Sequence, residues 1–424
     1  MKCRGLAWSC VLFMAPAIAI AQPAQPAPSE GPPVPAPPLP TPDAAEPAPP
    51  TSAGSSKPPA PPPDLPPPGF ANDPTAVAGY QDGLYIATRD DAFRFGIQSW
   101  LQARWEIGDA SGDVAQRFAL PVGRITFAGH AFSTVDLRIS TEVGQGTVEL
   151  TDAFIDQPVF GGKLHLRFGQ FKPLFSHQQT LYRSELQFTD RPITAAFTGF
   201  LRDLGASVHH EPRGRSSGIE LAAGVFNGAG VTPTSNCIQS SDPITMDPSI
   251  ACTPPTTSIE DGRPLAVARI GWRGDRVDVE RDDDLDHGHA RAAVGVGYAV
   301  DLADGEARDM VHVITADLLF KGHGVSFGAA GFLKSARLGG ERTWELAWHS
   351  QLGYALVPHI VELAARFAQV PLAVGDRQAQ EATGVVNVYR NEHRLKWQLE
   401  AGVMRLTGIR DLDWVARAQT QLVF

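Results

Sequence analysis

The final residues of the chain alternate between two kinds of environment, and this pattern restricts what they can fold into. One set of alternate positions carries the larger apolar side chains, and the other carries charged, amide and small apolar side chains. A period of two indicates a β strand with a different environment on each face. The first set is Trp414, Ala416, Ala418, Thr420, Leu422 and Phe424, and the second is Asp413, Val415, Arg417, Gln419, Gln421 and Val423.

Similar strand patterns recur upstream and bring the expected number of strands to sixteen. Their lengths suit tilted strands that span a membrane with about 9–11 residues plus overhang, and an even count is usual for single-chain bacterial barrels. The sequence therefore predicts an all-β fold, a 16-stranded antiparallel transmembrane β-barrel. The expected strands are 92–106, 116–130, 133–143, 147–158, 163–171, 203–211, 217–226, 264–274, 290–300, 310–320, 323–333, 342–356, 358–370, 381–390, 393–404 and 411–424.

The two faces of these strands have the polarity of a barrel in lipid. In one strand Leu395, Trp397 and Leu399 oppose Lys396, Gln398 and Glu400. An apolar exterior with a charged interior is the reverse of a soluble protein, and aromatic residues near strand ends suit the membrane interfaces. After the N-terminal segment there is no apolar run of about 18–20 residues, so no transmembrane helix is expected.

The connections between strands alternate in length, as the short periplasmic turns and longer outer loops of such barrels do. The long connections include 172–202 and 227–263, whereas turns such as Ala131-Phe132 and Asn391-Glu392 are tight. One connection on the short side, 275–289, is long and contains Asp282-Asp283-Asp284. We expect it to be an acidic solvated loop.

The N-terminal part indicates export. Lys2 and Arg4 precede an apolar segment, and Ala19-Ile20-Ala21 fits a cleavage site, so residues 1–21 are interpreted as a signal peptide, with a short membrane anchor as the alternative. Residues 22–79 are rich in Pro and Ala and should form a disordered periplasmic spacer before a barrel domain at 80–424. The part at 22–70 is either a passive linker or a tether that contacts the cell wall.

Two cysteines remain after the predicted signal peptide, Cys237 and Cys252. In an oxidising compartment they most simply form one disulfide, and two unbonded thiols are the alternative. The spacing of Cys and His predicts no metal site. His209 and His210 are adjacent on a strand and point to opposite faces, and the pair His287 and His289 would bind a metal only weakly.

One region resembles the phosphate-selective porin family of Gram-negative outer membranes. It begins with Gly169-Gln170-Phe171-Lys172-Pro173-Leu174-Phe175-Ser176 and continues with Asp190-Arg191, Ala196-Phe197 and Arg202-Asp203-Leu204-Gly205. The acidic residue of the loop pair is Asp190 here, where the family more usually has Glu. The resemblance implies an outer-membrane porin of a kind that often forms trimers, whose 172–202 loop folds into the lumen as a constriction.

The expected function is passive diffusion of small hydrophilic solutes, with phosphate or other anions preferred if the cationic side chains dominate. Lys172 and Arg191 are the constriction candidates, and Asp190, Arg202 and Asp203 are expected to anchor the loop rather than contact solute. Acidic residues such as Asp136, Glu362 and Glu400 should also face inward, so a mixed-charge, weakly selective lumen is the alternative. The other lumen candidates are Arg94, Arg104, Arg138, Arg167, Arg269, Arg366, Lys396 and Arg417.

Two other classes of function compete with a channel. A barrel could anchor the outer membrane to the cell wall through 22–70, or it could be an outer-membrane hydrolase. No Ser lies in a Gly-x-Ser-x-Gly context, and the sequence predicts no enzyme, cofactor or metal. The net charge of −10 and the absence of a basic block argue against a nucleic-acid partner, so membrane lipid and small solutes are the expected partners.

Overall fold

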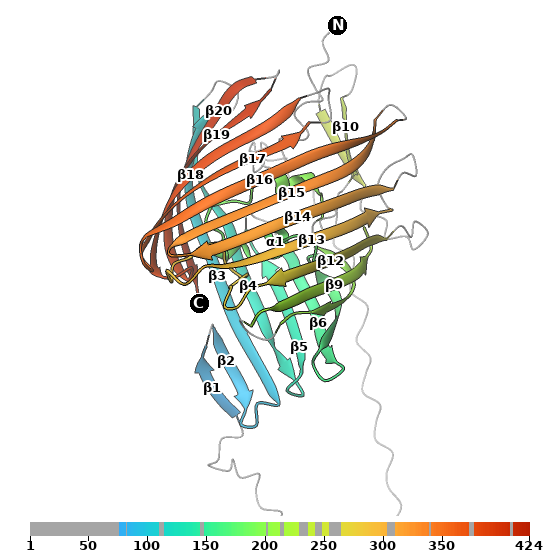
Figure 1. Ribbon diagram of the computed structural model, residues 1–424, viewed down its shortest axis with the longest axis vertical. Helices are drawn as coiled ribbons and strands as arrows, with labels where there is room; N and C mark the ends of the chain where they lie inside the picture. Colours follow the sequence, from blue (N-terminus) through green and yellow to red (C-terminus); the bar gives the residue numbers. More distant parts are fainter. Residues whose placement is uncertain are drawn as a thin grey trace, which may run out of the picture. The chain divides into compact units, whose positions relative to one another are not determined.

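Sixteen antiparallel strands close into a barrel in the computed structural model (Figure 1). The structure describes residues 76–81, 83–109, 114–144, 148–200, 202–212, 216–228, 236–241, 248–253, 264–302, 310–338, 341–372, 377–407 and 410–424. The barrel strands are β3 Phe93–Asp109, β4 Val114–Ala131, β5 Val135–Glu142, β6 Glu149–Val159, β7 Leu164–Phe171, β8 Asp203–His210, β9 Gly218–Phe226, β12 Leu265–Arg273, β13 Arg291–Asp301, β14 Val311–Gly322, β15 Val325–Leu338, β16 Glu341–Val357, β17 Val361–Pro371, β18 Gln378–Asn391, β19 Leu395–Leu406 and β20 Arg410–Val423. All sixteen predicted strands are therefore confirmed.

Closure joins β3 to β20, the first and last strands of the barrel. Their register runs from Trp100 opposite Val423 to Asp109 opposite Trp414. A hairpin of β1 (Ala76–Tyr80) and β2 (Leu84–Thr88) was not predicted, and β2 pairs with β3 from Arg94 to Ile97. β1 starts at Ala76, a few residues inside the range expected to be spacer.

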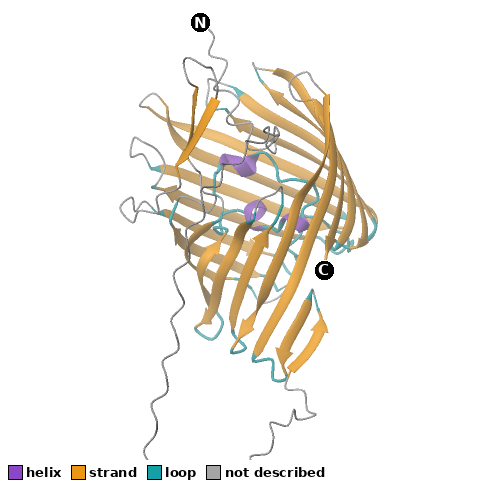
Figure 2. Ribbon diagram, turned by 180° about the vertical axis from the view of Figure 1, so that it is seen from behind, coloured by secondary structure: helices purple, strands orange, loops and turns teal. Residues whose placement is uncertain are grey.

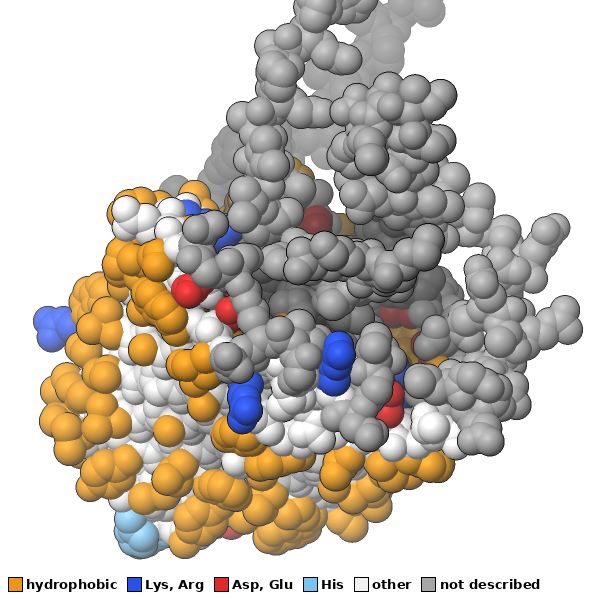
Figure 3. Space-filling model, turned by 90° about the horizontal axis from the view of Figure 1, so that it is seen from above, with side chains coloured by type: hydrophobic (Ala, Val, Ile, Leu, Met, Phe, Trp, Pro, Cys, Tyr) orange, Lys and Arg blue, Asp and Glu red, His pale blue; other side chains and the backbone are white. Residues whose placement is uncertain are grey.

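Successive side chains of each barrel strand point alternately to the outer and the inner face of the wall, and the two faces have different environments. On β19, Leu399 is 62% exposed on the outer face, whereas its neighbour Gln398 is 1% exposed on the inner face. Figure 3 shows hydrophobic side chains around the outer wall. Because the apolar face points away from the protein and the polar face points into it, the predicted inversion of polarity is present in the structure.

One end of the barrel, which we call the turn end, carries the tight turns. His323 and Gly324 link β14 to β15 with φ angles of +55° and +83°, values suited to a two-residue hairpin turn whose twist matches the strands. Only glycine adopts the second angle without steric cost. The opposite end, which we call the loop end, carries the connection of residues 172–202.

Residues 172–202, the constriction segment, fold into the lumen as predicted. The segment contains α1 (His177–Thr180), the 3-10 turn η1 (Arg183–Glu185) and α2 (Thr194–Phe197). Figure 2 shows these short helices within the ring of strands. The hydroxyl of Thr194 lies 2.7 Å from Nδ1 of His349 on β16, so α2 reaches the far wall.

A second hairpin comprises β10 (Asn236–Ser241) and β11 (Pro248–Thr253), in which Cys237 lies opposite Cys252 in the backbone register. The predicted signal peptide and residues 22–75 of the predicted spacer lie outside the described residues. Among the described residues, the helices are all too short or too polar to cross a membrane.

Candidate solute passage in the lumen

Asp190 attaches the constriction segment to the barrel wall. Its carboxylate accepts hydrogen bonds from Arg104 on β3 at 2.7 and 3.2 Å and from Arg183 within the segment, and Arg417 on β20 lies 3.9 Å away. Burial would raise the pKa of Asp190, but the guanidinium groups of Arg183, Arg104 and Arg417 hold it well below its usual value. The carboxylate therefore stays ionised and keeps the segment in place.

Further donors of the same segment reach buried carboxylates of the wall formed by β17 to β19. Gln187 donates to Glu362 at 2.5 Å and to Ser326 at 2.8 Å. The backbone N–H and the hydroxyl of Thr189 donate to the two oxygens of Glu400 at 2.8 and 2.7 Å. Glu362 and Glu400 face inward, as the alternation predicts, but they hold the segment and are not exposed to a water-filled pore.

The connection 275–289, which we call the turn-end segment, also folds into the lumen. The expectation of an acidic solvated loop is wrong, because Asp282, Asp283 and Asp284 are only 2%, 1% and 1% exposed. Asp283 accepts a hydrogen bond from His393 at 2.5 Å, and Asp284 pairs with Arg291 at 2.6 Å. The acidic run is thus buried against the guanidinium group at the start of β13 and the imidazole of the β18–β19 turn.

The two infolded segments meet inside the barrel. Asp282 of the turn-end segment accepts hydrogen bonds from Gln178 at 3.0 and 3.1 Å, and Nε2 of His177 lies 3.3 Å away. Burial raises the pKa of Asp282, but the hydrogen bonds from His177 and Gln178 outweigh it, and the pKa is lower than usual. The lumen is therefore spanned from both ends by one connected network.

Apolar packing fills much of the lumen on the side of β7 to β16. Phe175 of the constriction segment is fully buried and packs edge-on against Phe200 with ring centroids 5.2 Å apart. Both belong to a cluster that includes Phe226, Phe332 and Val313 from the wall. Solute cannot pass through this close-packed region.

A cavity of about 370 Å³ remains between the constriction segment and the wall formed by β4 to β7. Most of the residues that line it have charged or polar side chains, and the others, such as Phe154, Phe171 and Leu174, are apolar. From the wall come Asp136, Arg138, Asp152, Asp156 and Arg167, and from the segment and its end come Lys172, Thr180, Tyr182 and Arg202.

Lys172 and Arg191, the predicted constriction residues, lie together beside this cavity. Both donate to the carbonyl oxygen of Leu181, Lys172 at 3.3 Å. Within the described residues Nη1 of Arg191 is buried without a hydrogen-bond partner. Burial and the positive charges of Arg191 and Arg202 hold the pKa of Lys172 well below its usual value. The site is thus a cluster of basic side chains in which Lys172 and Arg191 donate to a carbonyl oxygen instead of a carboxylate.

Arg202 and Asp203 both stand at the end of the constriction segment and contact different parts of the protein. Arg202 binds Asp152 of β6 at 2.8 and 3.3 Å, and Asp203 accepts the backbone N–H groups of Leu204 and Gly228 at 2.8 and 2.6 Å. Each residue fixes the return of the constriction segment into β8, but each does so through a different neighbour.

Most of the other cationic side chains that were predicted to face the lumen are paired with carboxylates or carbonyl oxygens of the protein. Arg269 makes two hydrogen bonds to Asp317 at 2.6 and 2.7 Å, and Lys396 donates to the carbonyl oxygens of Ser184 and Leu186 at 2.9 and 2.8 Å. Arg138 and Arg167 line the cavity, where Arg138 contacts Tyr182 and Arg167 pairs with Asp156. The remaining partners are Gln81 for Arg94, Glu381 for Arg366 and Glu400 for Arg417.

Two groups of polar residues were missed by the sequence reasoning. His177 and His393 bind the acids of the turn-end segment, and His165 and His209 converge on Asp156. Alternation alone places His165 and His209 on the inner face, but only the register of β7 and β8 shows that they are opposite one another.

No protein-family model matches the chain, and no curated protein matches it. The chain is similar in structure to several barrels. Its sequence identity to each of them is low, so the likeness concerns the fold alone. An outer-membrane protein of Vibrio cholerae, OmpT in trimer form, has 9% identity and a TM-score of 0.53, with 79% of this chain and 100% of that chain covered. The anion-selective porin of Comamonas acidovorans has 10% identity and a TM-score of 0.51, over 78% and 99%. The outer-membrane channel DcaP of Acinetobacter baumannii has 11% identity and a TM-score of 0.52, over 82% and 100%.

Proposed function

We propose that the protein is a porin of a Gram-negative outer membrane, through which small hydrophilic solutes diffuse passively. The observation that carries this proposal is a closed barrel with an apolar outer wall and a charged cavity beside an infolded segment. Sixteen strands enclose enough space for an aqueous channel, whereas about eight would be filled by side chains. The similar barrels include one named as a porin and one named as a channel, which agrees with the proposal.

The passage in this proposal runs along the wall of β4 to β7. That region contains the cavity, while the lumen beside β8 to β16 is filled by the apolar cluster that the constriction segment forms with the wall. Solute would therefore pass Arg138, Arg167 and Lys172 on its way through.

We also infer a preference for anions at the narrow part. Four of the charged residues that line the cavity are cationic (Arg138, Arg167, Lys172 and Arg202), against three acids (Asp136, Asp152 and Asp156). Arg191 and Arg124 add positive charge next to Lys172. Cationic rings favour anion passage, and guanidinium groups bind phosphate and carboxylate oxygens with two hydrogen bonds. Phosphate is the solute to which the resemblance in residues 169–205 points.

Conductance in a planar lipid bilayer tests the porin function. Purified, folded protein should give stable conductance steps, and a folded barrel that never conducts would overturn the proposal. Ala128 is an inner-face residue of β4 that lines the cavity, so Ala128→Trp should narrow the proposed passage and reduce each step. Unchanged conductance of Ala128→Trp would show that ions take another route.

The apolar outer wall would contact lipid, and part of it would contact neighbouring copies if the protein forms a trimer. The trimer form of the Vibrio cholerae barrel is the reason to examine assembly here. Chemical cross-linking in native membranes should then give a three-copy product, and a single-copy band alone would contradict a trimer.

A further inference from the structure

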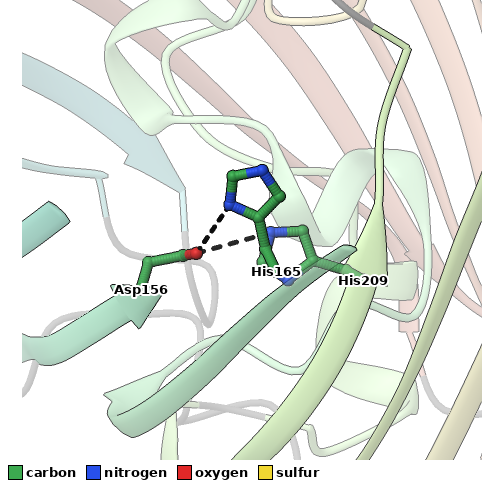
Figure 4. Close-up of side chains that lie close together, drawn as sticks. All are labelled: Asp156, His165 and His209. Carbon is green, nitrogen blue, oxygen red and sulfur yellow. Dashed lines mark hydrogen bonds and ion pairs between the residues drawn. The ribbon is translucent and has the colours of Figure 1, made fainter. Parts of the chain in front are cut away.

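Three side chains from three neighbouring strands converge at the lumen wall, towards the turn end. Asp156 lies on β6, His165 on β7 and His209 on β8 (Figure 4). His165 is directly opposite His209 in the register of β7 and β8. Asp156 is directly opposite Arg167, two residues along β7 from His165, so Asp156 lies diagonal to His165. A sheet holds cross-strand neighbours at short and fixed spacing, so the three side chains are positioned by the barrel itself and not by a loop.

The distances between their donor atoms suit a single metal ion. Nδ1 of His165 is 3.0 Å from Oδ1 of Asp156, and Nε2 of His209 is 3.4 Å from Oδ2. All three residues offer a donor atom within 4.8 Å of the others. A tetrahedral ion with bonds of about 2.0–2.2 Å needs donor atoms about 3.3 Å apart. Only a small inward shift would therefore be needed to place all three in coordination distance.

The identity of the donors points to a transition metal. Two imidazole nitrogens and one carboxylate oxygen form a donor set that zinc uses when it keeps its fourth position for water or another small ligand. Imidazole is a poor ligand for Mg²⁺ and Ca²⁺, which prefer oxygen. Within the described residues Nδ1 of His209 has no hydrogen-bond partner, so Asp156 is the one polar group that directs this ring.

Arg167 acts on the same carboxylate through Oδ2, the oxygen that also lies 3.4 Å from Nε2 of His209. Its Nε donates to Oδ2 of Asp156 at 2.7 Å, which leaves Oδ1 facing His165. A carboxylate ligand is commonly held in place by an outer hydrogen-bond donor of this kind. Asp136 lies opposite Asp156 in the register of β5 and β6, so two carboxylates balance the charge of Arg167 and favour an added cation.

An ion can reach the site from the lumen. The side chain of His165 is 33% exposed, whereas those of Asp156 and His209 are 5% and 6% exposed. One of the three candidate ligands is therefore partly exposed to solvent, and the other two are buried. Asp156 and Arg167 also line the cavity, so a bound ion would lie at the edge of the proposed passage.

We propose that Asp156, His165 and His209 bind a divalent transition metal ion such as Zn²⁺ on the inner wall of the barrel. The site is separate from the cationic cluster around Lys172, and metal binding does not depend on whether the barrel conducts. Bound metal would add positive charge beside Arg167 and leave one coordination position for a small ligand from the lumen.

Isothermal titration of untagged, full-length protein in detergent with ZnCl₂ at pH 7.5 tests the proposal. One high-affinity ion should bind per chain, and His165→Gln and His209→Gln should each weaken binding by at least about tenfold. His210→Gln is the matched control, since His210 follows His209 directly but points to the opposite face. Its affinity should equal that of the unmodified protein.

A second measurement identifies the ligands. Co²⁺ in place of Zn²⁺ should give visible absorption bands of a low-coordinate histidine site, and both His variants should lose them. The proposal is overturned if the unmodified protein binds no ion at one per chain, or if both correctly folded His variants bind Zn²⁺ as it does.

Discussion

Asp282 accepts two hydrogen bonds from the side-chain amide of Gln178, at 3.0 and 3.1 Å, and so joins the segments that enter the lumen from opposite ends. Nothing in the sequence links the two residues, which stand more than a hundred positions apart. Together they connect the constriction to the turn end, which makes the position of one segment dependent on the other.

This contact should resist acid down to low pH. The pKa of Asp282 is lower than its ordinary value, since hydrogen bonds from His177 and Gln178 outweigh the effect of burial. A carboxyl with a depressed folded-state pKa stabilises the fold above its unfolded pKa of about 3.9, and this stabilisation is lost as the pH falls through the folded value. Conductance and resistance to limited proteolysis should therefore stay constant from pH 8 to about 5 and change only below about 4. A transition near pH 6 would assign control to histidines instead.

Removal of the Asp190 carboxylate should loosen the constriction segment. Asp190→Asn leaves Arg104, Arg183 and Arg417 without this counterion, and breaking a largely buried pair costs about 3–5 kcal/mol. We expect faster proteolysis within 172–202 and noisier single-channel currents. Asp275→Asn is the control, because that side chain is 72% exposed and an exposed pair contributes about 0–1 kcal/mol. Equal behaviour of both variants would contradict an anchoring role.

The double substitution Lys172→Gln, Arg191→Gln should reduce anion preference. Both side chains stay polar, so the segment should remain ordered while two positive charges beside the cavity are removed. Reversal potentials in a KCl gradient should show a lower chloride-to-potassium permeability ratio. The difference should shrink at 1 M salt, where the Debye length is about 3 Å. An unchanged ratio in dilute salt would make these two residues structural.

Substitution to arginine should separate the lipid face from the cavity face. Leu399→Arg places a charge on the outer wall, where it should cost about 2–4 kcal/mol near the bilayer midplane. Ala128→Arg points into the cavity and should fold with little penalty. Refolding into vesicles with urea titration gives both values. Equal penalties would mean that one of the two faces has been assigned wrongly, because a register slip of one residue exchanges them.

Cys237 and Cys252 should form a disulfide within the β10–β11 hairpin. The backbone register places them opposite one another, and directly opposed residues of antiparallel strands lie about 4.5–5.5 Å apart between Cα atoms, within the range of disulfides. A loop of this length gains about 3 kcal/mol in the chain-entropy treatment. Mass spectrometry of unreduced protein should show the linked peptides, and two free thiols would contradict the bond.

The strands could be predicted because the barrel imposes the same rule on every one of them. Positions such as Leu399 and Gln398 must alternate between lipid and lumen, and that demand is visible in any one strand. The hairpin at 76–88 was missed because its strands are only five residues long and follow the Pro-rich segment.

The interior could not be predicted to the same degree, because its contacts join distant positions. Gln398 faces inward, as the alternation predicts, but it is buried and donates to the backbone carbonyl oxygen of Gln187 in the constriction segment, a contact that alternation does not reveal. The Asp282-Asp283-Asp284 run suggested solvent because its partners, His177 and His393, lie about a hundred residues away in either direction. His165 and His209 likewise come together only through strand register.

The hairpin before the barrel gives β3 a continuous partner along its edge. β20 covers β3 from Asp109 to Trp100, Phe424 exchanges hydrogen bonds with Ser99, and β2 takes over from Ile97 to Arg94. Without β2, the N–H and C=O groups at the start of β3 would form an unprotected strand edge, the kind of template on which another chain can add itself. The β1–β2 hairpin therefore pairs the part of β3 that lies beyond the end of the closing strand, and it moves the strand edge to β1, which is only five residues long.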